Sequence, residues 1–283
     1  MAGGSGARGR GAWARRHALT ALWTILAWGT VAGFLSVFAW MLMIALKNQV
    51  DNTAIPPVWI FRPTFQNFVN VLTGKSFVRF MLNSLVVGVG STALGLALGL
   101  PAAYSIARHK QRGLAMAILF ARMAPFMSYL VPWFIMFRKL ELIDSYAGLI
   151  ASHLVISLPL VVWLMIGFFE DVPKEIEEAA ELDGCSRPGT FLYVALPVSR
   201  NGLVATAVLS FIFSWNNFIF ALILAGPRTR TVPVAVFSFL SYEQIDWGGL
   251  AAAATIITLP VLVFIFLIHK QIVRGLTFGA VKG

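Results

Sequence analysis

Acidic side chains, which are suited to pairing with basic groups, gather in one short stretch of this chain. Seven of the twelve aspartates and glutamates lie there: Glu170, Asp171, Glu175, Glu177, Glu178, Glu181 and Asp183. Ile176, Ala179 and Ala180 lie among them at helical spacing and form a small apolar face. A short helix with a smooth alanine face and an acidic flank is suited to dock in a partner's groove. It is equally suited to rest on the chain's own surface, and the pattern does not choose between the two.

The ends of this helix can be predicted from its capping residues. Asp171 can cap the N-terminus, and Pro173 suits the first turn. The early glutamates complement the helix dipole. Gly184 follows at a position where such a helix should end.

Residues for catalysis or metal binding are not grouped in the sequence. The four histidines are scattered, at His17, His109, His153 and His269. Gly74-Lys75-Ser76 resembles the end of a phosphate-binding loop, but the full motif needs a further glycine where Val69 stands. The single cysteine, Cys185, excludes an internal disulfide framework. We therefore expect no catalytic residue, metal or cofactor in this chain.

The composition indicates a membrane protein. Of the 283 residues, 58% are hydrophobic and 12% charged, and the mean hydropathy is +0.79. A soluble domain has about a quarter of its residues charged. The net charge of +10 would fit nucleic-acid binding in a soluble protein. Here the basic residues lie in short segments between apolar runs, as charges that orient a membrane protein do, so we expect no nucleic-acid partner.

Six apolar runs are long enough to cross a bilayer as helices, which takes roughly 20 residues. They are continuous and lack strand-like alternation, so we predict an all-α, polytopic membrane fold. The spans are predicted at Leu19–Leu46, Phe80–Ala107, Leu114–Phe137, Ala147–Phe169, Leu203–Ala225 and Leu250–Ile268. Residues 1–18 are predicted to form a disordered arm, 19–46 an uncleaved first helix, 47–79 an outer loop and 80–283 a core domain with five spans.

The lysines and arginines predict the orientation of the spans. With the N-terminus inside, thirteen of them fall in inner segments and eight in outer segments. Both termini are therefore expected in the cytoplasm. The acidic stretch then begins residues 170–201, the longest predicted cytoplasmic connection.

Small and polar residues inside the predicted spans indicate contacts between helices or with a solute. Ser91, Gly95 and Gly99 repeat at four-residue spacing and would let another helix approach closely. Ser210, Ser214 and Asn217 form one polar stripe, which suits a path for a hydroxyl-rich solute or hydrogen bonds between helices. Trp215 can stack on a sugar or pack, and Arg122 can clamp carbonyl groups or bind a ligand. The further candidates for the path are Asn83 and Thr255.

Glu178-Ala179-Ala180, Gly184 and Val194-Ala195-Leu196-Pro197 follow one another at the spacing EAA-x3-G-x9-V-x-LP. This resembles the EAA loop of ATP-binding-cassette import permeases, with Val194 in place of the family's isoleucine. Four further phrases are similar to maltose-type sugar permeases: 122–125, 142–149, 215–218 and 274–283. The likeness covers residues 60–283. Asn217 stands where the family more often has an acidic residue.

The resemblance implies the permease subunit of an ATP-driven, binding-protein-dependent importer of a sugar or polyol. In that family the EAA loop forms a coupling helix that seats in a cleft of a cytoplasmic ATPase subunit. The implied coupling residues are Glu178, Ala179, Ala180, Asp183, Gly184, Leu196 and Pro197. The tail within 270–283 is implied to reach the ATPase through Gly279, Ala280, Val281, Lys282 and Gly283. The implied partners are a homologous second permease, two ATPase subunits that bind ATP and Mg, an extracytoplasmic solute-binding protein and the lipid of the bacterial inner membrane.

Two other classes of membrane protein fit this sequence less well. An ion-coupled secondary transporter would place paired carboxylates in its spans, and the predicted spans contain none. A membrane-embedded enzyme would need converging catalytic side chains, and none are visible. The family that this chain resembles also includes glycerol-phosphate importers, so the sequence does not identify the transported solute.

Overall fold

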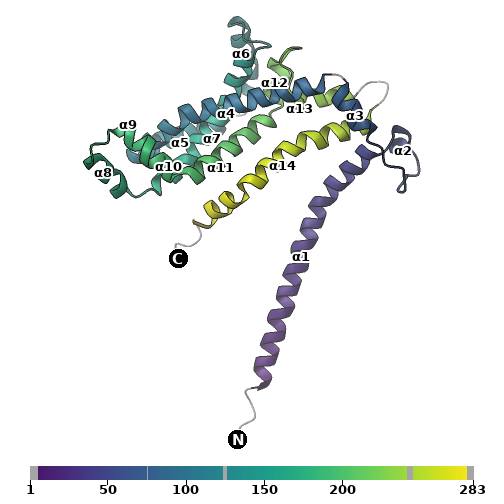
Figure 1. The fold of residues 1–283 in the computed structure, drawn as a ribbon, viewed down its shortest axis with the longest axis horizontal. Coiled ribbons are helices and arrows are strands. Elements are labelled where there is room, and N and C mark those ends of the chain that lie inside the picture. The colour runs from purple at the N-terminus through teal and green to yellow at the C-terminus, as the bar shows by residue number, and fades with distance from the viewer. Residues whose placement is uncertain (1–5, 75, 124–125, 241–244, 279–283) are drawn as a thin grey trace. The chain divides into compact units, whose positions relative to one another are not determined.

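In a computed structural model of the chain, residues 6–74, 76–123, 126–240 and 245–278 are described (Figure 1). Helices joined by turns make up most of this part, and the one extended pairing in it is an isolated bridge between Leu240 and Ile245. The predicted all-α class is therefore confirmed. The chain forms two compact units, residues 1–70 with 246–255 and residues 71–245 with 256–283.

The first unit contains α1 (Gly6–Leu46) and α2 (Gln49–Thr53) and the start of α3 (Gln66–Thr73). Asn67 Nδ2 donates to the carbonyl oxygens of Ala45 at 2.8 Å and Lys47 at 2.7 Å, which holds α3 to the end of α1. The helix α1 begins at Gly6, so the arm expected to be disordered is helical from that residue on. Seven of residues 6–16 are alanine or arginine, which both favour helix.

The second unit is built around three helices, α4 (Phe77–Arg108), α7 (Tyr146–Glu170) and α11 (Arg200–Trp215), which lie side by side (Figure 1). α14 (Trp247–Phe278) runs through both units. The remaining elements are α5 (Arg112–Met123), α6 (Phe126–Lys139), α8 (Lys174–Leu182), α9 (Arg187–Thr190), the π-helix η1 (Phe191–Ala195), α10 (Leu196–Val198), α12 (Ile219–Leu224), α13 (Val232–Ala235) and the 3₁₀ helix η2 (Val236–Phe239).

The close contact of α4 with α7 depends on glycine. A Cβ atom added at Gly99 would lie 2.6 Å from Val161 Cγ1, and one at Gly95 would lie 3.1 Å from Ser157 Oγ. The predicted small-residue stripe is thus confirmed as a helix-packing surface. Toward the C-terminal ends of α4 and α7, buried apolar side chains such as Ala103 and Met165 form a core. Ala195 of the predicted cytoplasmic loop belongs to the same core, which positions that loop.

Four described helices are long and apolar enough to cross a membrane: α1 over Leu19–Leu46, α4, α7 and α14 over Trp247–Phe266. A fifth span results if Arg187–Val198 and Arg200–Trp215, which meet at 81°, count as one. The predicted third span is divided between α5 and α6. The count of six therefore remains a prediction.

The predicted fifth span, Leu203–Ala225, is interrupted by two asparagines. α11 ends at Trp215 with Asn216 as its C-cap, and α12 begins only at Ile219. The Asn216 side chain donates to the Ile212 carbonyl oxygen at 2.9 Å, and Asn217 Oδ1 accepts from the Phe220 N–H at 3.2 Å. Asparagine side chains compete with backbone groups for hydrogen bonds in this way. The prediction of one uninterrupted helix over Leu203–Ala225 was therefore wrong.

Candidate functional site

The acidic stretch forms α8, which ends where Gly184 was predicted to end it. Gly184 has a φ of 92°, a conformation that favours glycine. Its N–H donates to the Glu181 carbonyl oxygen at 3.1 Å, and the Cys185 N–H donates to the Ala180 carbonyl oxygen at 2.9 Å. These two bonds form a Schellman motif.

The N-terminus of α8 differs from the prediction. Asp171 has a helical conformation and is the C-cap of α7, with its N–H donating to the Gly167 carbonyl oxygen at 3.1 Å. Pro173 is the residue that precedes α8. The predicted cap at Asp171 is wrong because α7 continues to Glu170 and leaves only three residues for the turn.

Glu177 anchors α8 to the end of α4. It is the buried residue of α8, with 7% of its surface exposed. Arg108 Nε donates to its two carboxylate oxygens at 3.0 and 2.8 Å, and Arg108 Nη2 forms an ion pair with Oε1. The Tyr104 hydroxyl donates to Oε2 at 2.9 Å. The sequence could not single out this glutamate, because its partner Arg108 lies 69 residues away along the chain.

The other side of α8 is exposed. Leu182 is 89% exposed and Ile176 44%. Glu178 and Ala179 are exposed as well, and Ala180 is half-buried. These apolar side chains are not covered by the described part of the chain, and exposed apolar surface with a polar rim is typical of an interaction site.

A pocket of about 230 Å³ lies between α8 and the end of α4. Its lining residues carry charges of both signs, a hydroxyl or an imidazole: Tyr104, Arg108, His109, Lys174, Glu177, Glu178, Glu181 and Arg187. Such a pocket can hold a charged side chain of a partner. No group of three His, Cys, Asp or Glu residues that could hold a metal ion occurs within the searched, described residues.

The second half of the predicted coupling loop contains α9, η1 and α10. Ser186 caps α9 by accepting a bond from the Gly189 N–H at 3.4 Å. Leu196 packs against the core cluster that contains the fully buried Ala195. Pro197 lies in the first turn of α10 and is exposed.

The polar stripe of α11 faces its neighbours α4 and α7. The Ser91 hydroxyl donates to Ser214 Oγ at 2.8 Å, and His153 Nδ1 lies 2.6 Å from the same oxygen. Ser210 is fully buried, and its hydroxyl has no hydrogen-bond partner within the described chain. Ser214 thus joins α11 to α4 and α7. Asn217 lies past the end of α11 and accepts from the Phe220 N–H, so it does not share this stripe.

Other residues of the predicted path also bind groups of this chain. Trp215 Nε1 donates to the Ile257 carbonyl oxygen at 3.2 Å. Thr255 Oγ1 donates to the Ala251 carbonyl oxygen at 2.8 Å. The side chain of Arg122 and the tail 279–283 lie outside the described residues. The translocation path therefore stays a prediction.

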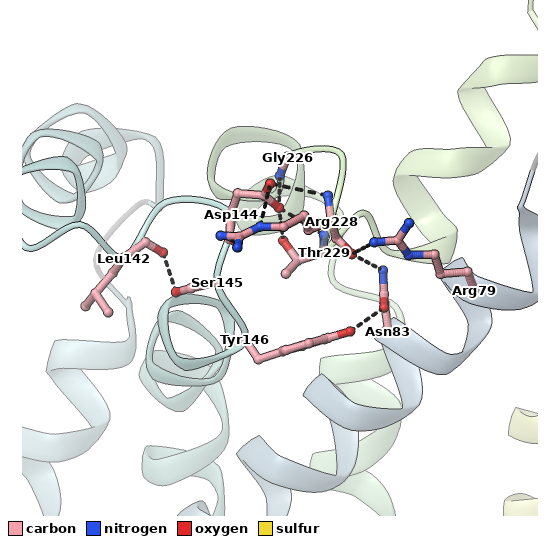
Figure 2. Close-up of polar contacts among 9 residues, drawn as sticks. All are labelled: Arg79, Asn83, Leu142, Asp144, Ser145, Tyr146, Gly226, Arg228 and Thr229. Atoms are coloured by element: carbon pink, nitrogen blue, oxygen red, sulfur yellow. Dashed lines mark hydrogen bonds and ion pairs between the residues drawn. The ribbon is translucent and has the colours of Figure 1, made fainter.

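A second polar cluster, which the sequence did not predict, is centred on Asp144 (Figure 2). Asp144 Oδ1 accepts bonds from the N–H groups of Gly226 at 3.0 Å and Thr229 at 2.9 Å, and from the Thr229 hydroxyl at 2.8 Å. Asp144 Oδ2 accepts from the Arg228 N–H at 3.3 Å. One carboxylate thus holds the loop between α12 and α13 beside the start of α7.

Asn83 of α4 binds the same loop from the other side (Figure 2). Its Nδ2 donates to the carbonyl oxygens of Arg228 at 3.0 Å and Arg230 at 2.9 Å, and its Oδ1 accepts from the Tyr146 hydroxyl at 2.7 Å. Asn83 is 1% exposed. This residue, a candidate for the path, fixes a loop in the structure.

Burial alone would raise the pKa of the Asp144 carboxyl group. The bonds from the Thr229 hydroxyl and from the backbone of Arg228, Thr229 and Gly226 outweigh it, so the pKa lies below the ordinary value of 3.8. The ion pair with Arg228 adds little, because the nitrogen lies 3.5 Å away and the arginine side chain is 73% exposed.

Comparison with known proteins connects this geometry to a family. Residues 95–278 match the family described as binding-protein-dependent transport system inner membrane component. The chain is 36% identical to the probable ABC transporter permease protein y4oR of Sinorhizobium fredii, over 92% of this chain and 95% of that protein.

Several relatives carry names that state a solute, and two of them are named for disaccharides that contain glucose only. The trehalose transport system permease protein SugB of Mycobacterium tuberculosis is 34% identical, over 92% of this chain and 97% of the relative. The trehalose/maltose transport system permease protein MalG of Thermococcus litoralis is 33% identical, over 87% and 91%.

A solved structure has the same fold. It is a bacterial ABC transporter involved in the import of the acidic polysaccharide alginate, and one of its chains superposes with a TM-score of 0.69. The match covers 87% of this chain and 97% of that chain at 19% identity.

Proposed function

The chain belongs to the family of binding-protein-dependent transport system inner membrane components, and from this membership we propose that it is a permease subunit that admits a sugar or polyol while a partner hydrolyses ATP. The curated relatives are named as transport permeases rather than enzymes. We assign ATP and Mg binding to two separate ATPase subunits. A second permease and an extracytoplasmic binding protein complete the proposed importer in the bacterial inner membrane, with both termini in the cytoplasm.

The structural observation that supports coupling to an ATPase is the two-sided character of α8. Glu177 is buried against α4, while Ile176, Ala179 and Leu182 are exposed. An amphipathic helix that only rested on its own protein would bury its apolar side chains. The exposed apolar side with its carboxylates supports docking to a partner, and Glu178 is placed to pair with a basic group in that partner.

The solute class is proposed from the relatives. Two of them are named for trehalose or for trehalose and maltose. A path for such solutes needs hydroxyl and amide groups, and Ser210, Ser214 and Asn217 remain candidates after a rearrangement of the helices. The described helices α4 and α14 contain no acidic residue, and the one acidic residue of α7 is Glu170, at its end. This favours the ATP-driven importer over an ion-coupled transporter.

Deletion and complementation of this chain would test the function. Uptake would be measured with radiolabelled trehalose, maltose, glucose, sorbitol and glycerol 3-phosphate. We expect at least one of the first four to lose uptake at least tenfold on deletion and to recover it on complementation. Collapse of the ion gradients at constant cellular ATP should leave that uptake unchanged.

Three results would contradict the proposal. They are unaltered uptake of every carbohydrate and polyol, a loss confined to glycerol 3-phosphate, and complete loss of uptake on collapse of the ion gradients. ATP hydrolysis by the purified chain alone would contradict the division of labour between subunits.

A further inference from the structure

Two adjacent glutamates of α8 have opposite surroundings. Glu177 is 7% exposed, whereas Glu178 is exposed. Consecutive residues of an α-helix differ by about 100° in direction, so one carboxylate faces the permease while the next faces outward. The exposed position suits docking, which leaves the role of the buried one to be explained.

The buried carboxylate is bound by two residues of a single helix face. Tyr104 and Arg108 are four residues apart in the last turns of α4, which places them on one side of the helix. Arg108 donates to Glu177 through Nε and Nη2, and Tyr104 donates through its hydroxyl. Arg108 also donates to the Val172 carbonyl oxygen at 3.3 Å. Charge-assisted bonds from a planar guanidinium group fix direction as well as distance.

An aromatic cluster supports this junction from behind. The Tyr104 ring lies 5.5 Å from Phe169 and 5.1 Å from Phe191, and those two rings are 6.1 Å apart. Phe169 is fully buried. The ends of α4 and α7 and the start of η1 therefore meet at the point where Glu177 is held.

The covalent connections of α8 are short turns. Residues 171–173 join it to α7, and residues 183–186 join it to α9, with Gly184 at a φ of 92°. Turns can absorb a displacement by changes of φ and ψ. The buried Glu177 carboxylate accepts hydrogen bonds from two residues of α4, so α8 cannot shift relative to α4 at this point without breaking them.

We propose that Glu177, held by Arg108 and Tyr104, is the joint through which a displacement of docked α8 is passed to the membrane helix α4. This inference rests on the proposed function. The three residues act here as positioning residues, because they bind one helix of the permease to another. Glu178 keeps α8 docked, and Glu177 makes the docked helix move α4.

The test uses the whole importer in lipid nanodiscs, with a single reporter cysteine. Cys185, the one cysteine of the chain, is replaced in the variant Cys185→Ser. Val78, which is 47% exposed at the start of α4, is replaced in Val78→Cys. The rate of maleimide labelling is measured with and without ATP, Mg²⁺ and vanadate, and bound ATPase is measured by co-purification.

We expect nucleotide to change the labelling rate at least fivefold in this background. Glu177→Gln should keep the ATPase bound and hydrolysing ATP, while the change in labelling rate falls below twofold. Tyr104→Phe should give an intermediate change. The double variant Arg108→Glu/Glu177→Arg should restore at least half of it. Glu175→Gln, in the exposed first turn of α8, is the matched control and should behave as the background.

The outcomes separate this inference from the proposed function. An unchanged labelling response in Glu177→Gln would overturn the joint, and loss of ATPase binding in that variant would reassign Glu177 to docking. If no ATPase subunit co-purifies with the background chain, the proposed function is wrong instead.

Discussion

Replacing Gly184 with valine is expected to reduce uptake at least tenfold while the membrane helices stay folded. Gly184 has a φ of 92°, and a left-handed conformation costs an L-residue about 1–2 kcal/mol, more when it is β-branched. Nothing lies within 4 Å of an added Cβ at Gly184, so the effect would come from the backbone. The Schellman bonds would be lost, and the exposed end of α8 would be redirected. Uptake and the size-exclusion profile of the complex measure the two parts of this prediction.

Gly113→Val is the matched control for this substitution. Gly113 is exposed and also has open space around an added Cβ, but its φ is not positive. We expect its uptake to remain within twofold of the unmodified chain. Normal uptake in Gly184→Val, or an equal loss in both variants, would show that the end of α8 does not matter for coupling.

Asp144→Ala is expected to release the loop between α12 and α13. Four donors would lose their acceptor: the N–H groups of Gly226, Arg228 and Thr229, and the Thr229 hydroxyl. Each buried unsatisfied donor costs about 1–3 kcal/mol, and partial access of water limits the sum to about 2–4 kcal/mol. Trypsin cleavage after Arg228, measured on the folded complex, should become at least tenfold faster, and the melting temperature should fall.

Two variants separate the carboxylate from other effects at this position. Asp144 has a φ of 52° and Glu141 a φ of 56°, so Glu141→Ala reproduces the backbone strain at an exposed side chain and should have little effect on cleavage. Asp144→Asn keeps the Oδ1 acceptor, which receives three of the four bonds, and should be much milder than Asp144→Ala. Equal cleavage in Asp144→Ala and Glu141→Ala would contradict a role for the carboxylate.

The pH dependence follows from the lowered pKa of Asp144. Because the pKa in the folded state lies below the ordinary 3.8, the ionised carboxylate stabilises the fold at pH values above about 4. That stabilisation is lost only as the pH falls through the lowered value. The stability difference between the unmodified chain and Asp144→Asn should therefore be constant from pH 7 to about 5 and shrink in stronger acid. A difference that already disappears near pH 6 would contradict this explanation.

The sequence was sufficient for features that depend on neighbouring residues. The apolar runs predicted α1, α4, α7 and α14 as spans, and Gly184 predicted the end of α8. The glycine stripe of α4 predicted a close helix contact, because a missing side chain acts at its own position. These predictions needed no knowledge of the rest of the chain.

Features that depend on distant residues could not be predicted. Glu177 and Glu178 are neighbours of the same residue type, and what distinguishes Glu177 is its contact with Tyr104 and Arg108, 73 and 69 residues away. Asp144 finds its donors 82 to 85 residues later in the chain. The break at Asn216 was missed because the apolar residues on both sides concealed two side chains that compete with the backbone.

Cross-linking from the exposed end of α8 tests the central claim most directly. Leu182 is 89% exposed, so Leu182→Cys in the Cys185→Ser background can carry a benzophenone maleimide without disturbing the core. Leu140→Cys, 59% exposed after α6 in the segment predicted to lie outside, is the control. Illumination of the importer should join Leu182→Cys, but not Leu140→Cys, to the ATPase subunit. A photoproduct confined to the permease itself would show that α8 rests on its own chain, and the account of coupling would be wrong.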